Sequence, residues 1–141
     1  MTKSILRWGL IALLILFSAV FYTEIQGYIT SYAVFPVIKT FSAKSKTALA
    51  IIFTAFNFLC AILTAIITAL PCGYLARKRV KVIALLLLVS MQSIPTYLVF
   101  QEPKILNFIT VVWLGQFVSV AISAYAFAEI GCRIAAKKQE T

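Results

Sequence analysis

The sequence predicts an all-α integral membrane protein, a bundle of four transmembrane helices with both termini on the cytoplasmic side. Hydrophobic residues make up 62% of the 141 residues and charged residues only 12%. A soluble domain is about half apolar and about a quarter charged, so the surplus apolar surface is expected to face lipid. The apolar residues also form four long runs with few or no charges, each with the ~20 residues that a helix needs to cross a bilayer. The length corresponds to a single membrane domain, residues 1–141.

The first predicted helix covers about residues 6–28. Lys3 and Arg7 precede an apolar stretch that continues past Glu24, and it lacks the small-residue cleavage site of a signal peptide. We therefore expect a first helix that is retained. Residues 29–46 follow and are rich in aromatic side chains. Such a composition suits the headgroup region, which predicts a segment lying at the outer interface.

The second predicted helix covers about residues 47–75, within a run of 30 uncharged residues. As a straight helix these 30 residues would span about 45 Å, more than the hydrocarbon core of about 30 Å. We therefore expect either that the helix tilts or that its ends lie outside the hydrocarbon, with Pro71 marking the change. The third and fourth helices are predicted at about residues 82–100 and 105–130, because both stretches are apolar and nearly free of charge.

The distribution of Lys and Arg predicts the orientation. With the N-terminus inside, the cytoplasmic side holds nine basic residues: Lys3, Arg7, Arg77, Lys78, Arg79, Lys81, Arg133, Lys137 and Lys138. The other side holds four: Lys39, Lys44, Lys46 and Lys104. Positive residues are enriched in cytoplasmic loops, so this asymmetry favours both termini inside. Together with the compactness of the chain, it predicts a bacterial inner membrane.

Small residues mark one face of the second helix. At intervals of four residues it carries Asn57, Ala61, Ala65, Ala69 and Gly73. The fourth helix has the shorter series Gly115, Ser119 and Ser123. A spacing of four places residues on one face, and small residues let two membrane helices approach closely. We expect these faces to pack against each other inside the bundle or, alternatively, against a partner molecule.

Four polar residues within or near the predicted spans are candidates for an intramembrane site. The carboxamides of Asn57, Gln92 and Gln116 should point inward, because lipid cannot satisfy them. They act either as contacts between helices, worth about 1 kcal/mol each, or as the lining of a substrate path. Glu24 lies about 25 Å along its helix from Arg7, near the outer interface. It is either an interfacial carboxylate, solvated or paired with lysine, or a proton or cation site.

The predicted inner loop between the second and third helices is strongly basic. It contains Arg77, Lys78, Arg79 and Lys81. Such a cluster fixes topology and attracts anionic lipid headgroups, with about 1 kcal/mol per charge. On the last helix, Glu129 precedes Arg133 by four residues, which predicts an ion pair.

The composition excludes several kinds of chemistry. The sequence contains no His and no Asp, which rules out His-based metal and haem sites and a Ser-His-Asp triad. Cys60, Cys72 and Cys132 lack metal-site spacing and are expected to behave as small apolar residues. No phosphate-binding glycine motif is present. We therefore expect no catalytic residue, metal or cofactor, no nucleic-acid partner, and no enzymatic activity.

Two functions fit these features. The first is a non-enzymatic membrane protein that acts through helix–helix contacts, as an accessory or assembly subunit of a larger membrane complex or as a blocker of a membrane-acting toxin. Its partners would be the bilayer with its anionic headgroups and other membrane subunits or a second copy. The second is a small oligomeric transporter or channel with Glu24, Asn57 and Gln116 lining the path. A Glu24 that points into a cavity favours transport, and one that points toward outer lysines favours a structural role.

Overall fold

The computed structural model describes the backbone of residues 2–34, 36–37, 39, 46–77, 79–101 and 106–140. Over these ranges the fold is all-helical, as the sequence predicts, and contains no strand. The elements are α1 (Thr2–Ile29), a π-helical segment η1 (Thr30–Val34), α3 (Lys46–Ile67), α4 (Ala69–Ala76), α5 (Val80–Gln101) and α6 (Leu106–Glu140). Four spans of the described chain are long and apolar enough to cross a membrane: Ser4–Val34, Thr47–Ala76, Val80–Tyr97 and Val112–Lys138.

The helices extend beyond their predicted ends. The π-helical segment η1 continues α1 to Val34, into the stretch that the sequence predicts as interfacial. Helix α6 continues to Glu140, well past the predicted end near residue 130. The prediction ended the helix where the apolar run ends, but Ala, Lys, Gln and Glu are all strong helix formers. The rest of the predicted interfacial segment, apart from residues 36–37 and 39, lies outside the described residues, as do Lys78 and Lys104.

The long second run is divided at Thr68, between α3 and α4. Pro71 stands in the first turn of α4, where its missing N–H is not needed, whereas its ring disfavours a regular turn through Ile67. The Thr68 hydroxyl donates to the Thr64 carbonyl at 2.8 Å. The Thr68 carbonyl in turn accepts the Cys72 N–H at 3.1 Å. The change expected near Pro71 is therefore a brief interruption three residues before it.

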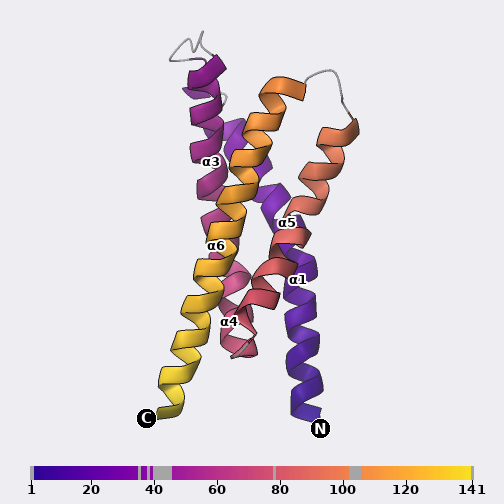
Figure 1. Ribbon diagram of the computed structural model, residues 1–141, viewed down its shortest axis with the longest axis vertical. Coiled ribbons are helices and arrows are strands. Elements are labelled where there is room, and N and C mark those ends of the chain that lie inside the picture. The colour runs from indigo at the N-terminus through magenta and orange to yellow at the C-terminus, as the bar shows by residue number, and fades with distance from the viewer. Residues whose placement is uncertain are drawn as a thin grey trace.

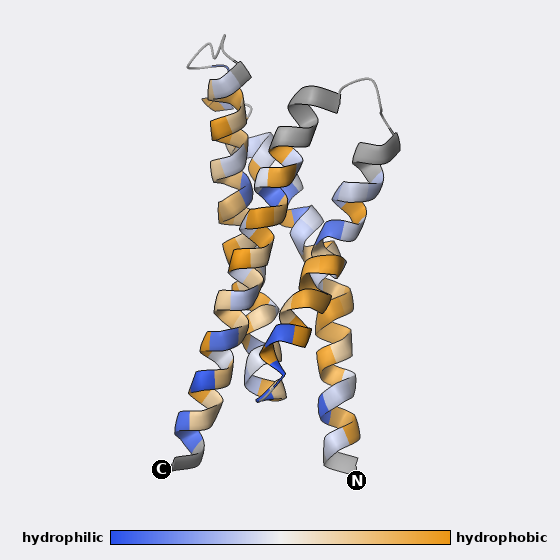
Figure 2. Cartoon of the chain, viewed as in Figure 1, coloured by the Kyte–Doolittle hydropathy of each residue, from blue (hydrophilic) through white to orange (hydrophobic). Residues whose placement is uncertain are grey.

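Figure 1 shows both termini and the turn between α4 and α5 at one end of the bundle, which we call the terminal end. Helix α3 begins and α5 ends at the opposite end. Helix α6 packs against α3, α4 and α5, while α1 packs against α5, α3 and α4. Hydrophilic residues gather at the terminal end, and apolar residues dominate the helices beyond it (Figure 2).

Small side chains pack tightly inside the bundle, whereas large apolar side chains cover its outer surface. Ala61 and Ala65 are fully buried, whereas Leu6, Leu16 and Val89 are 77%, 73% and 62% exposed. Soluble proteins show the opposite distribution, because large exposed apolar surfaces are unfavourable in water. The outer surface of this bundle is therefore suited to contact with hydrocarbon.

Candidate functional site

Each of the four long helices contributes one buried polar side chain to the same part of the interior. These residues, Tyr22, Asn57, Gln92 and Gln116, are here named the polar centre. Their exposed fractions are 0%, 4%, 4% and 5%. The Tyr22 hydroxyl on α1 faces the carboxamides of Gln92 on α5 and Gln116 on α6. One turn further along α1, Gln26 donates through Nε2 to Oδ1 of Asn57 on α3 at 3.1 Å.

The polar centre borders an apolar core cluster. Its buried members are Tyr22, Cys60, Ala61, Met91 and Val120. Asn57 and Gln116 precede members of this cluster by about one helical turn, so they share its inward face. Helical spacing thus explains how one chain brings polar groups from four helices together.

Five polar atoms of the polar centre are buried, and none of them makes a hydrogen bond of ordinary geometry within the described part of the chain, although the Tyr22 hydroxyl lies close to the carboxamides of Gln92 and Gln116. They are the Tyr22 hydroxyl, Asn57 Nδ2, Gln92 Nε2 and Oε1, and Gln116 Nε2. Buried polar atoms in native proteins are nearly always bonded, and an unpaired one costs about 1–3 kcal/mol. Such a concentration is expected where water or a small ligand completes the hydrogen bonds.

The side chains of the polar centre are uncharged and can both donate and accept hydrogen bonds. A carboxamide offers both donors and an acceptor, and a phenol does the same at one atom. None of the four side chains carries a charge, and the span Thr47–Ala76 contains no charged residue at all. A bare ion would find no opposite charge to offset its desolvation. The arrangement therefore suits a small uncharged guest that both donates and accepts hydrogen bonds.

Most neighbouring hydroxyl groups are already satisfied by their own helices. Thr64 donates to the Cys60 carbonyl at 2.9 Å, and Ser119 donates to the Gly115 carbonyl at 2.7 Å. Ser123 differs, since its hydroxyl is buried and has no partner among the described residues. The free hydrogen-bonding capacity thus lies mainly with the carboxamides and Tyr22.

The small residues that the sequence singles out pack inside the bundle. Ala61, Ala65 and Ala69 are fully buried, and Gly73 is buried with them. A Cβ atom on Gly73 would collide with the Ala128 backbone of α6. The face is therefore covered by other helices of the same chain, with α6 at Gly73, which corresponds to the intramolecular alternative.

The residues of α6 that pack closely against α3 and α4 are only partly the ones that the sequence predicts. Ser119 and Ser123 are buried, and Gly115 packs against Thr54, whose Oγ1 would lie 2.9 Å from an added Cβ atom. A second close backbone approach, comparable to that at Gly73, is at Gly131, where a Cβ atom would collide with the Leu70 carbonyl of α4 and lie 2.8 Å from the Tyr74 nitrogen. Gly131 is not among the residues that the sequence predicts to pack closely. Its sequence pattern is the series of small residues Ala124, Ala128, Gly131 and Ala135.

Glu24 lies outside the polar centre. It follows Tyr22 by two residues, which corresponds to about 200° around the helix and so to the opposite face. The Glu24 side chain is exposed and lines a hollow of about 290 Å³ together with Gly27, Tyr28, Ser31 and Tyr32. Within one chain, Glu24 therefore does not join Asn57 and Gln116 in a common path.

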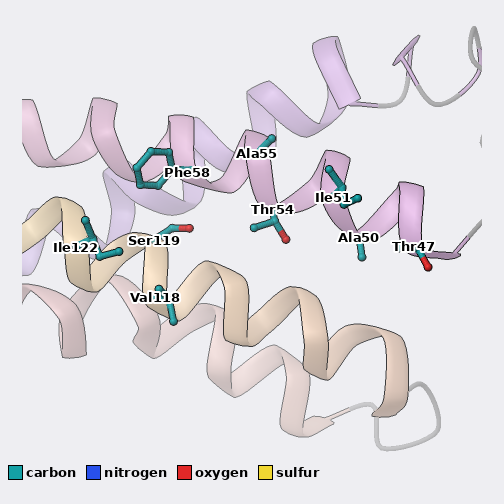
Figure 3. A pocket seen from close by; sticks show the side chains of 9 residues that line it. All are labelled: Thr47, Ala50, Ile51, Thr54, Ala55, Phe58, Val118, Ser119 and Ile122. Atoms are coloured by element: carbon teal, nitrogen blue, oxygen red, sulfur yellow. The ribbon is translucent and has the colours of Figure 1, made fainter.

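Helices α3 and α6 leave an open groove between them, shown in Figure 3. Its volume is about 630 Å³. The lining residues are Thr47, Ala50, Ile51, Thr54, Ala55, Phe58, Val118, Ser119 and Ile122. Those on α3 recur at intervals of three and four, so the groove follows the helix axis. Its shape and apolar lining suit a rod-like apolar guest, such as another helix.

The terminal end carries the basic residues of the turn between α4 and α5. Arg77 ends α4 with a left-handed φ of 62°, and its N–H donates to the Gly73 carbonyl at 3.1 Å. On α6, Arg133 Nε donates to Glu129 Oε1 at 3.0 Å, which confirms the predicted ion pair. Among the described residues, no group of three His, Cys, Asp or Glu side chains is placed to hold a metal ion.

Comparisons with protein-family models, with curated proteins and with solved structures found no match to this chain.

Proposed function

We propose that this chain is a non-enzymatic multi-pass membrane protein that binds a small uncharged solute at the polar centre, as a step in the passage of that solute across the membrane. The observation that carries the proposal is the set of five buried polar atoms that make no hydrogen bond of ordinary geometry with the described residues. An interior built only for packing would fill this position with apolar side chains, because the membrane interior penalises unpaired polar groups. The presence of these polar side chains in the interior indicates a role beyond helix packing.

The membrane location is supported by the four candidate spans and by their large exposed apolar side chains. We propose that the terminal end faces the cytoplasm, most simply that of a bacterium with the chain in its inner membrane. The residues that support this orientation are Arg7, Arg77, Arg79, Lys81, Arg133, Lys137 and Lys138, whereas the opposite end has fewer basic residues.

Cysteine labelling tests the orientation. In a variant without native cysteines, Lys39→Cys should react with a membrane-impermeant maleimide added to intact cells, and Lys138→Cys should react only after the cells are opened. Labelling of Lys138→Cys in intact cells would contradict the proposed topology.

A liposome assay tests the proposed solute. Purified protein in proteoliposomes should raise the permeability to water, urea or glycerol but not to potassium or chloride. Tyr22→Phe removes one unpartnered hydroxyl from the polar centre and should lower this permeability, while Tyr28→Phe removes the same atom from a side chain that is 64% exposed and should not. Permeability equal to that of empty liposomes for all three solutes, or equal effects of the two variants, would contradict the proposal.

A second function, as an accessory or assembly subunit or a toxin blocker, is favoured by the groove between α3 and α6. We propose as its occupant a transmembrane helix of another subunit. The support is that five of the nine lining residues are Ala, Ser or Thr and that the groove follows the helix direction, which permits close helix approach (Figure 3). The stripe Ala61, Ala65 and Ala69 is less suitable for this role, because it is fully buried against other helices of the same chain.

A matched pair of substitutions tests the groove. Ala55→Leu would partly fill it, and Ala12→Leu adds the same atoms to an exposed position on α1. A stoichiometric partner recovered in mild detergent should be lost with Ala55→Leu and kept with Ala12→Leu. A chain purified without a partner, or a partner kept by both variants, would count against the second function.

A further inference from the structure

A hollow at the terminal end combines basic, polar and apolar lining residues. Its volume is about 620 Å³, in the range of small-molecule sites in proteins. The lining residues are Arg77, Arg79, Val80, Lys81, Val82, Tyr125, Glu129 and Cys132. The turn between α4 and α5 and the first turn of α5 form one wall, and α6 forms the other.

The hollow is positively charged. Three of its lining residues, Arg77, Arg79 and Lys81, are cationic, and Glu129 is the single acidic one among them. The Glu129 carboxylate is engaged by Arg133 on its own helix, with Nε and Oε1 3.0 Å apart. This pair offsets the negative charge, so the remaining field attracts an anion.

The first turn of α5 adds backbone donors to the same hollow. The Ile83 N–H donates to the Arg79 carbonyl at 3.1 Å, so the N–H groups of Val80, Lys81 and Val82 precede the first bond of the helix. The side chain of Arg79 has no acceptor atom with which to cap them, and this turn contains no acidic residue. Val80, Lys81 and Val82 all line the hollow, where N–H groups without an acceptor in their own helix and the helix dipole favour an anionic oxygen.

Two contacts fix the turn between α4 and α5, which carries Arg77 and Arg79. The Arg79 guanidinium carbon lies 5.7 Å from the centre of the Trp8 ring on α1, a cation–π distance. The Cys132 thiol of α6 donates to the Arg77 carbonyl. Because the turn is fixed to both α1 and α6, less ordering of the turn is needed when a ligand binds.

The apolar part of the lining decides which anion fits. Val82 and Tyr125 are 54% and 46% exposed and face the hollow from α5 and α6. A free phosphate would leave these side chains uncovered, whereas a phospholipid covers them with its glycerol and upper acyl chains.

We propose that this hollow binds the headgroup of one anionic phospholipid of the inner leaflet. The phosphate contacts Lys81, the neighbouring arginines and the free N–H groups of α5. The sequence alone indicates only a general attraction of the basic loop to the membrane, whereas the hollow defines a site for a single lipid. The inference rests on the proposed membrane insertion and is independent of the polar centre.

Native mass spectrometry of the protein extracted from membranes tests the site. Phosphatidylglycerol and phosphatidylcholine are added at equal concentrations, with inorganic phosphate as a third arm. The protein should retain one phosphatidylglycerol in preference to phosphatidylcholine. Lys81→Gln should weaken phosphatidylglycerol retention about fivefold, the effect of one interfacial charge. Lys138→Gln, which removes the same charge at the same end but outside the hollow, should leave retention unchanged.

Three outcomes would overturn the site. Equal losses for the two variants would show general electrostatic attraction, equal retention of the two lipids would show no headgroup recognition, and binding of inorganic phosphate as tight as that of the lipid would show a phosphate site instead. A chain that is never found in the membrane fraction would instead refute the membrane location, so the two failures are distinguishable. Size-exclusion profiles equal to that of the parent protein confirm that Lys81→Gln, an exposed position, keeps its fold.

Discussion

The two halves of this bundle differ in how closely their helices pack and in the polarity of their interior. Near the terminal end, α4 and α6 meet backbone to backbone at Gly73 and Gly131, with no space for a further carbon atom. In the half that contains the polar centre, carboxamides and a phenol occupy the interior, and a groove opens between α3 and α6. Close contact between small residues stabilises membrane helices, whereas unpaired polar atoms destabilise them. We infer that close packing in the terminal half stabilises the bundle, whereas the other half holds the proposed solute site.

The largest expected effect is at the backbone contact. Gly131→Val and Gly73→Val place side chains against backbone atoms that cannot rotate away, so we expect a loss of at least about 3 kcal/mol or failure to fold. Gly9→Val and Gly27→Val are matched controls, because nothing lies within 4 Å of a Cβ atom at either position. Thermal unfolding in detergent, followed by tryptophan fluorescence, measures the difference. Equal unfolding temperatures for the two pairs would show that the terminal half is not tightly packed.

A smaller loss of stability is expected when the hydrogen bond between Gln26 and Asn57 is removed. Asn57→Leu removes the acceptor of the 3.1 Å hydrogen bond from Gln26 together with the buried Nδ2 atom that has no partner among the described residues, so the unfolding free energy should fall by less than about 1 kcal/mol. Gln26→Leu removes the donor, and the double variant should lose no more than the larger of the two single losses. Additive losses in this cycle would show that the two side chains do not interact.

Gly115 should be more tolerant than Gly131. The atom nearest to an added Cβ is the Oγ1 atom of Thr54, at 2.9 Å, and this side chain can rotate toward the groove. Gly115→Ala should therefore change the unfolding free energy by less than about 1 kcal/mol, because the gain in helix propensity offsets the crowding. A loss as large as that of Gly131→Ala would indicate that α3 and α6 are as closely packed as α4 and α6.

The smallest effect belongs to the surface ion pair. Arg133 is well exposed, and its bond to Glu129 joins residues one turn apart on α6. Arg133→Gln should lower stability by less than about 0.5 kcal/mol, and added salt should remove the difference. An effect that persists at high salt would assign Arg133 a role beyond this pair.

The sequence predicts the parts of the fold that depend on composition and spacing along one helix. Run length predicts the four spans, and the interval of four residues predicts the buried face from Ala61 to Gly73. The interruption at Thr68 differs from the predicted place near Pro71, because proline acts on the turn that precedes it.

Which residues form the polar centre could be determined only from the structure. The sequence draws attention to Asn57, Gln92 and Gln116 because they are carboxamides in apolar runs. It offers no means of adding Tyr22, since a tyrosine near the end of a predicted span is equally typical of the interface. Which helix adjoins which is a property of the assembled bundle, and so the pairing of Gln26 with Asn57 could not be predicted either.

The stability of the double variant Gln92→Met and Gln116→Met tests the central claim most directly. Methionine preserves chain length and approximate volume while removing three of the five unpartnered atoms. If these atoms serve solute binding, the unfolding temperature in detergent should stay the same or rise, and the solute permeability of proteoliposomes should be lost. A fall in unfolding temperature with permeability retained would show that the carboxamides hold the helices together and that the polar centre is not a binding site.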